Sequence, residues 1–249
     1  MFDRIRSLRT TWLCNTPVAR WKRMSEKAPR WNARRLTHAA LGIAVERFAN
    51  VPRKGGDTPY LSHLLAVSAL VMEHGGDEIQ TAAGLLHDVL EDTKIPAPEL
   101  VELLQTRGVS HHEARAVVDI VEATTDGTLD AARDDQDWPA RKRTYLDALR
   151  SKPRSHPALL VSLADKVHNI ESTRDDVRSR STIAFYDQPW FNAKAPEQKW
   201  YYQSLARIFR EKLDGESKVA RLLNRLESAV HEVFSGVPDT VKPELIERP

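Results

Sequence analysis

Apolar residues recur at helical spacing along most of the chain from residue 36 onward, and no stretch alternates long enough to predict a strand. The pattern predicts helices at 36–49, 60–74, 78–90, 97–107, 110–124, 138–150, 157–173, 196–213 and 217–234. Turn residues such as Gly75-Gly76 and the Pro96/Pro98 pair separate these segments, as is typical of helix ends. The expected fold class is therefore all-α.

Two of the predicted connections, 125–137 and 174–195, are longer than ordinary loops. The second contains Tyr186, Trp190 and Phe191, so we expect it to pack against the helices and to form a lid.

Three of the predicted helices carry polar residues inside otherwise apolar stretches. "GLLHDVLEDT" (84–93) places His87 and Asp88 after a buried-looking run, "LLVSLADKVHNI" (159–170) contains Asp165, and "DTPYLSHLLAV" (57–67) contains His63. Burying any of these side chains without a partner costs free energy, and neighbouring carboxylates repel one another. We therefore expect the three helices to bring them to one point, where a bound cation offsets the repulsion.

Two imidazoles and two carboxylates suit manganese, iron(II), zinc or a related divalent ion. Four protein ligands leave positions for water, and a metal-bound water can become a nucleophile for phosphorus near neutral pH. Glu91 and Asp92, one turn further on, could orient that water or relay its proton. Taken singly, His63 could be a satisfied core histidine and Asp165 a paired buried carboxylate; it is the conjunction that favours a metal site.

The composition is that of a globular protein of 249 residues, 41% hydrophobic and 29% charged. No apolar run approaches the length of a membrane span, and no secretory signal is evident. The single cysteine, Cys14, excludes a disulfide framework and a thiolate metal site. A reducing, cytoplasmic setting is expected.

The net charge of +2 averages two unlike parts. Residues 1–35 hold ten Lys/Arg against Asp3 and Glu26, or +8, and the remaining residues carry 27 basic and 33 acidic side chains, or −6. Within this arm Ile5, Leu8 and Trp12 recur at helical spacing, which suits contact with an anionic membrane surface or, less so, nucleic acid. A loosely docked or disordered tail is the commoner case.

Four segments resemble one known family. "LLHDVLEDT" resembles the HDxxED motif of the HD metal-dependent phosphohydrolases, in the branch that includes the hydrolase domain of RelA/SpoT-type alarmone enzymes. "RKGGDTPYLSH" (53–63) and "LADKVHN" (163–169) resemble that branch's RKxGxPYxxH and LADRLHN motifs. "WFNAKAPEQKWYY" (190–202) resembles a C-terminal segment of stand-alone bacterial members. The likeness covers about residues 36–212, with the motifs in the family's order.

The resemblance implies an HD-domain helical bundle around a central metal, usually Mn²⁺. Its metal ligands fall on His63, His87, Asp88 and Asp165. Its acidic catalytic pair falls on Glu91 and Asp92.

The resemblance also implies the substrate. The basic residues near the nucleotide base correspond to Arg53 and Lys54, and a nucleotide-contacting asparagine corresponds to Asn169. The typical reaction removes pyrophosphate from the 3′ position of ppGpp or pppGpp and leaves GDP or GTP. The length suits a small stand-alone hydrolase, with a basic extension at 1–35, the HD-type domain at 36–215 and a C-terminal helix and tail at 216–249.

The chain departs from the family pattern at two places. Members often have a His and a Gln before the Arg-Lys pair, where this chain has "FANVPRK" with Phe48. After "LADKVHN" an arginine is common where this chain has Glu171, whose charge would repel a polyphosphate if it faced one. Two alternatives follow: an HD phosphohydrolase for another nucleotide or small phosphate ester, or a non-catalytic regulatory protein of the same fold.

Arg141, Lys142 and Arg143 follow Trp138-Pro139 on a predicted helix. They could neutralise a substrate phosphate or form a solvated helix face, and all three cannot point into one site.

Overall fold

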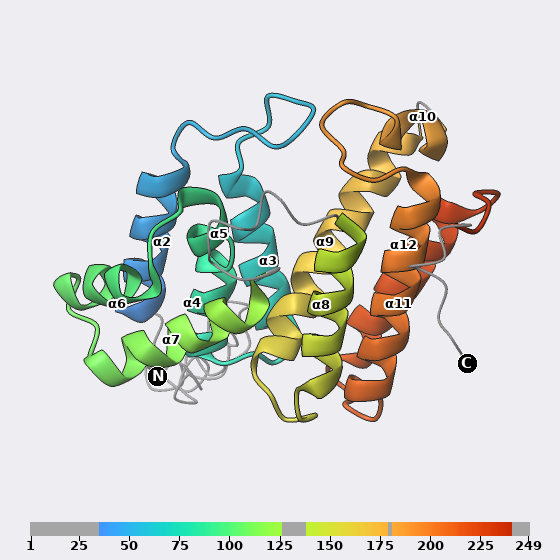
Figure 1. Ribbon diagram of the computed structural model, residues 1–249. Coiled ribbons are helices and arrows are strands. Elements are labelled where there is room, and N and C mark those ends of the chain that lie inside the picture. Colours follow the sequence, from blue (N-terminus) through green and yellow to red (C-terminus); the bar gives the residue numbers. More distant parts are fainter. Residues whose placement is uncertain (1–34, 126–137, 179–180, 241–249) are drawn as a thin grey trace, which may run out of the picture. The chain divides into compact units, whose positions relative to one another are not determined.

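The computed structural model describes residues 35–125, 138–178 and 181–240, and every regular element in these ranges is a helix (Figure 1). The helices are α2 (Leu36–Phe48), α3 (Leu61–Glu73), α4 (Glu78–Leu86), α5 (Val89–Thr93), α6 (Ala97–Thr106), α7 (His111–Thr124), α8 (Trp138–Ser151), α9 (Ala158–Val177), α10 (Thr182–Tyr186), α11 (Ala195–Leu213) and α12 (Ala220–Phe234). The predicted all-α class is confirmed.

Helix α9 lies at the centre of the packing. It contacts α3, α4 and α7 on one side and α11 and α12 on the other. Leu159, Leu163 and Ile170 are fully buried along it, as expected for a helix whose apolar residues face several neighbours. Its polar residues Asp165 and Asn169 are thereby held inside the bundle, next to α3 and α4.

The prediction of one continuous helix at 78–90 is wrong, because the helix is interrupted at His87 and Asp88. Helix α4 begins with a capping box between Asp77 and Gln80 and ends at Leu86, and α5 begins at Val89. The His87 side chain bonds through Nδ1 to the carbonyl oxygen of Gly84 at 2.9 Å. That carbonyl is the acceptor the residue 88 amide would use in a continuous helix, so the side chain competes with the backbone and aims the imidazole inward.

The connection expected at 174–195 is partly helical. Helix α9 extends to Val177, and Ser181 caps the short helix α10 by accepting a hydrogen bond from the Ala184 amide at 3.2 Å. Tyr186 is buried and Phe191 packs against the core, as expected, whereas Trp190 is exposed. The role of this connection as a lid stays a prediction.

Helix α12 packs against both α9 and α11. The predicted domain boundaries stay a prediction, and the basic arm, Cys14 and residues 126–137 lie outside the described residues. In the part of the chain that the structure describes, no helix combines the length and apolarity needed to cross a bilayer.

His74 is buried at the end of α3, and neither ring nitrogen has a hydrogen-bond partner among the described residues. Burial and then the positive charges of Arg221 and Arg225 lower the pKa of His74 from its usual 6.5. The folded protein therefore binds this proton less readily than the unfolded chain, so the contribution to stability is full above pH 6.5 and falls as the pH drops below it.

Replacing His74 with leucine is expected to raise the free energy of unfolding by about 1 kcal/mol at neutral pH, since two unsatisfied buried nitrogens are removed. The gain should be larger below pH 6.5, where the unfolded wild type takes up a proton at this residue. Urea unfolding at both pH values measures it, with the exposed His112→Leu as the control. A loss of stability equal at both pH values would contradict this account of His74.

Candidate metal centre and active site

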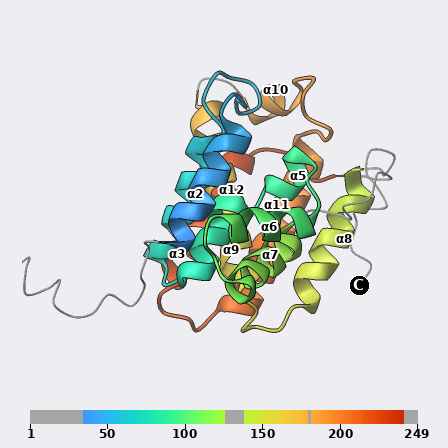
Figure 2. The same cartoon turned by 90° about the vertical axis from the view of Figure 1, so that its left-hand side faces the viewer.

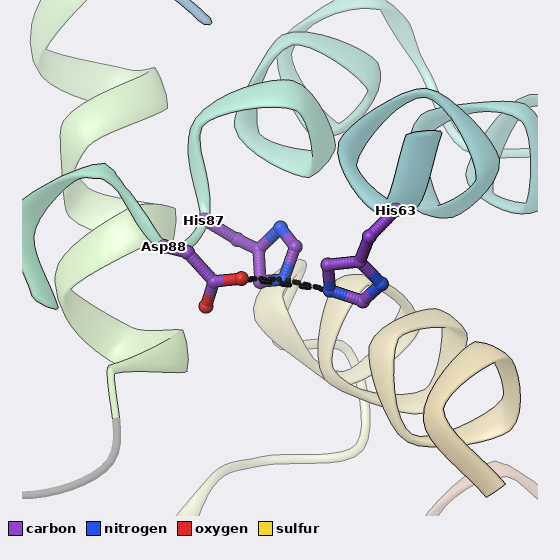
Figure 3. Close-up of side chains that lie close together, drawn as sticks. All are labelled: His63, His87 and Asp88. Atoms are coloured by element: carbon purple, nitrogen blue, oxygen red, sulfur yellow. Dashed lines mark hydrogen bonds and ion pairs between the residues drawn. The ribbon is translucent and has the colours of Figure 1, made fainter. Parts of the chain in front are cut away.

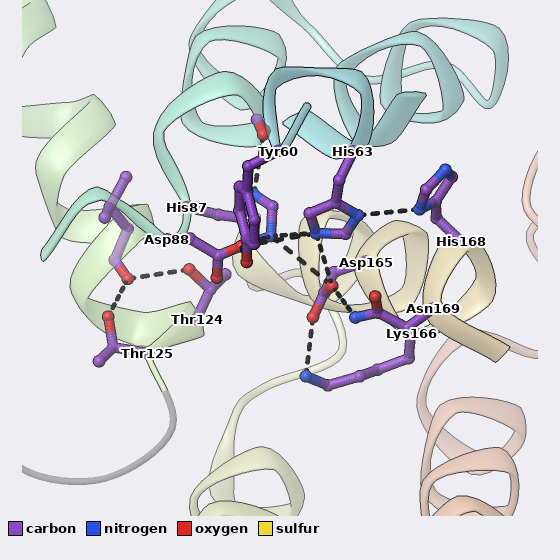
Figure 4. A network of polar contacts seen from close by, with 12 residues as sticks. Tyr60, His63, His87, Asp88, Thr124, Thr125, Asp165, Lys166, His168 and Asn169 are labelled. Atoms are coloured by element: carbon purple, nitrogen blue, oxygen red, sulfur yellow. Dashed lines mark hydrogen bonds and ion pairs between the residues drawn. The ribbon is translucent and has the colours of Figure 1, made fainter. Parts of the chain in front are cut away.

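Three parts of the fold bring the four predicted ligands together. His63 lies in the first turn of α3, His87 and Asp88 form the junction of α4 and α5, and Asp165 lies in the middle of α9 (Figures 3 and 4). Each element is held by its own buried apolar residues, so the polar side chains point into the space between the helices.

One atom of each side chain faces the same point. His63 Nε2 lies 3.2 Å from His87 Nε2, 3.5 Å from Asp88 Oδ2 and 3.3 Å from Asp165 Oδ1. His87 Nε2 lies 3.0 Å from Asp88 Oδ2 and 3.6 Å from Asp165 Oδ1. The ligand atoms of His63, His87 and Asp88 all lie within 4.8 Å of one another, and Asp165 lies near both nitrogens but outside this group. Ligand atoms about 2.1 Å from one ion at right angles are about 3 Å apart, so the spacing of the first three suits a single divalent ion.

The far nitrogens of both imidazoles are held by hydrogen bonds. His87 Nδ1 donates to Gly84 as described, and His63 Nδ1 lies 2.8 Å from His168 Nδ1. Burial and then the charges of His63 and Arg53 lower the pKa of His168 to about 4, so His168 is neutral and can accept the proton of His63. This arrangement leaves the Nε2 lone pairs of both ligands free for a metal.

The two carboxylates also have partners. Tyr60 Oη donates to Asp88 Oδ2 at 2.7 Å. Lys166 Nζ donates to Asp165 Oδ2 at 2.7 Å, and Asn169 Nδ2 donates to Asp165 Oδ1 at 2.6 Å. These bonds fix the orientation of both ligands, as outer partners of metal ligands usually do (Figure 4).

The protonation of the cluster favours a cation. Burial alone would lower the pKa of His87, but Asp88 and Asp165 raise it well above 6.5. Burial likewise opposes ionisation of Asp165, but Lys166 and the two histidines hold its pKa well below the usual range. The carboxylates are therefore ionised, and the position between the four atoms attracts a proton or a metal ion.

Glu91 and Asp92 lie on α5, directly after the ligand pair. Desolvation and then the charge of Asp88 raise the pKa of Asp92, although the Tyr60 hydroxyl and Lys54 act in the opposite direction. Tyr60 thus lies close to both Asp88 and Asp92. The catalytic role of Glu91 and Asp92 stays a prediction.

Asn169 joins the predicted nucleotide residues to the ligands. Its amide oxygen accepts a hydrogen bond from Arg53 Nη2 at 3.1 Å while its nitrogen donates to Asp165. The second terminal nitrogen of Arg53, Nη1, is buried and has no hydrogen-bond partner among the described residues. Lys54 is exposed beside it. The basic residues therefore lie at the edge of the same site.

Sequence reasoning missed Tyr60, Lys166 and His168 as partners of the ligands. Each stands within a quoted motif, Tyr60 in "DTPYLSH" and the other two in "LADKVHN", next to or near a ligand. In "LADKVHN" several polar residues interrupt an apolar helix, and this clustering could have indicated that Lys166 and His168 are partners of a ligand.

Both departures from the family pattern have structural partners. The Phe48 ring stacks on Tyr60 with centroids 5.0 Å apart and an interplanar angle of 13°. The Glu171 carboxylate accepts two hydrogen bonds from Arg225 of α12, at 2.9 and 2.7 Å. Its charge is therefore compensated by Arg225, which removes the expected repulsion of a polyphosphate.

Of the three basic residues of α8, Lys142 lies over the rings of Trp138 and Tyr201, at 5.8 and 4.8 Å from their centroids. Arg141 shares a helix face with Tyr145, over whose ring Lys166 lies at 5.2 Å. Arg141 therefore lies on the helix face that carries the buried Tyr145, whereas Lys142 packs on Trp138 and Tyr201. A role of these basic residues in binding phosphate stays a prediction.

Replacing Tyr60 with phenylalanine is expected to weaken metal binding about tenfold, because Asp88 loses the hydrogen bond that orients it. Titration of the metal-free protein with Mn²⁺ by calorimetry measures the change. Tyr186→Phe, which also removes a buried tyrosine hydroxyl, is the control. Equal affinity of Tyr60→Phe and wild type would contradict the role given to Tyr60.

The fold and these four side chains define an all-α protein with a mixed histidine and aspartate candidate metal centre. A family model described as "HD domain" matches residues 40–186, more than half of the chain. The protein belongs to the HD domain family.

The chain is similar to a named pyrophosphokinase and to a named pyrophosphohydrolase. The chain is 27% identical over 239 residues to a GTP pyrophosphokinase of Streptomyces coelicolor, which covers 92% of this chain but 26% of that protein. It is 33% identical over 138 residues to the guanosine-3′,5′-bis(diphosphate) 3′-pyrophosphohydrolase MESH1 of Xenopus tropicalis, covering 54% of this chain and 68% of MESH1. The chain thus spans about a quarter of the Streptomyces relative and most of MESH1.

Solved structures share the fold. A metazoan ortholog of SpoT, described as hydrolysing ppGpp, superposes with a TM-score of 0.58 at 20% identity, covering 82% of this chain and 98% of that one. A Listeria monocytogenes protein superposes with a TM-score of 0.55 at 25% identity, covering 71% of this chain and 98% of that one.

Proposed function

We propose that this protein is a metal-dependent phosphohydrolase that converts ppGpp and water to GDP and pyrophosphate. The observation that carries the proposal is the convergence of side chains from three parts of the fold. The Nε2 atoms of His63 and His87 lie 3.2 Å apart, and one oxygen each of Asp88 and Asp165 lies 3.0 to 3.6 Å from both nitrogens. The name of the MESH1 relative supports the choice of substrate.

The four ligands suit a divalent ion bound by nitrogen and oxygen, and we propose Mn²⁺. When bound, such an ion polarises a phosphoryl oxygen and lowers the pKa of a coordinated water toward neutrality. The ligands leave room for such a water because four protein atoms do not fill six positions.

Glu91 and Asp92 are proposed as the acid–base pair. A carboxylate takes a proton from the attacking water, whose oxygen forms a bond to the phosphorus attached to the ribose 3′ oxygen. The bond between that phosphorus and the 3′ oxygen breaks, pyrophosphate leaves, and the 3′ oxygen takes up a proton to become the hydroxyl of GDP. The raised pKa of Asp92 suits a group that both accepts and returns a proton.

Arg53, Lys54 and Asn169 are proposed to bind the nucleotide. The unpartnered Nη1 of Arg53 offers a donor to a bound ligand, and the bond from Nη2 to Asn169 holds the guanidinium in place. The ion pair between Glu171 and Arg225 keeps a negative charge from acting on the phosphates.

The activity is tested by incubating the purified protein with ppGpp and Mn²⁺, with and without EDTA. GDP and pyrophosphate are expected in equal amounts, and only without the chelator. A panel of other nucleotides and sugar phosphates run in parallel identifies the alternative, an HD phosphohydrolase for another ester. Absence of ppGpp turnover with turnover of another ester would overturn the choice of substrate, and absence of all turnover would favour a regulatory protein.

For a nucleotide-hydrolysing enzyme we also propose a cytoplasmic location and contact of the basic arm with an anionic surface. Nucleic acid is not the proposed partner, because the described residues that carry the chemistry form a small buried site.

A further inference from the structure

The proposed nucleotide residues Arg53 and Lys54 lie on a turn whose base is fixed by the backbone. The Arg53 amide donates to the Thr58 carbonyl at 2.8 Å, and the Tyr60 amide donates to the Val51 carbonyl at 2.8 Å. Residues 54–59 are all exposed to solvent. The Gly56 amide also donates to the Arg53 carbonyl at 3.3 Å, so backbone bonds define the turn, while its side chains face solvent.

The indole of Trp190 contacts this turn. A Cβ atom built on Gly55 would lie 3.1 Å from Cζ2 and 3.2 Å from Cε2 of Trp190, so the ring lies directly against the glycine. Gly55 has φ +81°, a conformation that also favours glycine. The turn and the segment 187–194 lie at the same end of the helices in both views (Figures 1 and 2).

Trp190 is attached to a buried aromatic cluster. Its ring centroid lies 6.3 Å from that of Phe191, which packs at 5.0 Å on Phe185 and at 4.9 Å on Tyr186. Tyr186 in turn stacks on Phe234 of α12 at 6.0 Å. The Trp190 side chain itself is 36% exposed, so its position is not explained by burial in the core. Trp190 therefore connects the aromatic cluster, through Phe191, with the turn at Gly55.

The turn is thus held from two sides. Asn169 of α9 binds the guanidinium of Arg53, and Trp190 covers the backbone at Gly55. Lys54 lies between these two attachments. Without the tryptophan, the bond from Arg53 to Asn169 would remain the only side-chain contact described here that ties the turn to the rest of the domain.

We propose that Trp190 is a positioning residue for the substrate, holding the Arg53–Lys54 turn in the conformation that binds the nucleotide. The role in substrate binding rests on the proposed ppGpp hydrolysis. The contact of the Trp190 ring with Gly55, called the clamp below, does not. The contacts of Trp190 are with Gly55 and Phe191, not with the four proposed metal ligands. Its loss should therefore weaken nucleotide binding and leave metal binding unchanged.

Steady-state kinetics with ppGpp and Mn²⁺ test the substrate part. Trp190→Ala is expected to raise KM about tenfold with kcat within about twofold of wild type, since binding energy is lost equally before and during reaction. Trp190→Phe should recover most of the affinity, because a smaller ring still covers Gly55. Ile183→Ala removes an exposed apolar side chain from the preceding helix α10. It is the matched control and should leave KM unchanged. Unchanged KM in Trp190→Ala would overturn the proposal.

Hydrogen exchange without substrate tests the clamp itself. The peptide covering 51–60 should exchange faster in Trp190→Ala than in wild type or Ile183→Ala, while Mn²⁺ affinity measured by calorimetry stays the same. Unchanged exchange would overturn the clamp whatever the enzyme hydrolyses. Faster exchange in Trp190→Ala, together with no ppGpp hydrolysis by the wild type, would retain the contact with Gly55 and overturn its assignment to that substrate.

Discussion

Replacing Asp88 with asparagine is expected to lower kcat/KM for ppGpp at least about 1,000-fold, because a lost charged ligand removes several kcal/mol of transition-state stabilisation. Asparagine keeps the shape of the side chain and one oxygen, so the fold should persist. The missing negative charge is what the ion needs beside His63 and His87, and Asp88 Oδ2 is the ligand atom nearest to His87 Nε2. Bound Mn²⁺ should fall from one ion per chain toward zero.

Metal analysis, far-UV circular dichroism and kinetics on the same preparation measure these effects. Asp147→Asn, on an exposed residue of α8, is the matched control and should behave as wild type. An Asp88→Asn protein that is folded, free of metal and fully active would contradict the metal site as the catalytic centre.

Replacing Glu91 with glutamine is expected to lower kcat by about 100-fold or more while the protein still binds one Mn²⁺, since a positioned acid–base group contributes about 10² to 10⁴. Asp92→Asn should have an effect of the same kind. The two residues follow the ligand pair on α5 and are proposed as the acid–base pair, not as ligands. They should therefore separate chemistry from metal binding, which Asp88→Asn cannot do.

The comparison uses kcat, KM and metal content for both variants, with Glu102→Gln of α6 as a control away from the site. Loss of bound metal together with activity would show that Glu91 or Asp92 is a ligand. Unchanged kcat in both variants would remove them from the mechanism.

The helices and the approach of the four candidate side chains to one another could be predicted because both leave strong local signals. Periodic apolar residues indicate a helix, and a lone His63 or Asp165 in such a run conflicts with burial unless it has a partner. The break at His87 could not be predicted, because it depends on which backbone carbonyl the imidazole reaches in three dimensions. Local spacing alone favours a continuous helix there.

Contacts between distant segments were also beyond the sequence. From the sequence, Glu171 is expected to place a negative charge near the phosphates. In the structure it accepts a hydrogen bond from Arg225, which lies 54 residues further along the chain. The sequence predicts Trp190 to be part of a lid. Its contact with Gly55 could not be predicted, because it depends on the paths of two loops. Tyr60 and His168 carry no periodic signal of their own, since their roles follow from the positions of Asp88 and His63.

The most direct test is anomalous diffraction at the manganese absorption edge from crystals of the protein grown with Mn²⁺. The account predicts one strong peak within about 2.3 Å of Nε2 of His63 and His87 and of one carboxylate oxygen each of Asp88 and Asp165. No peak there, or a peak that His63 or Asp165 does not reach, would contradict a single ion shared by the three helices.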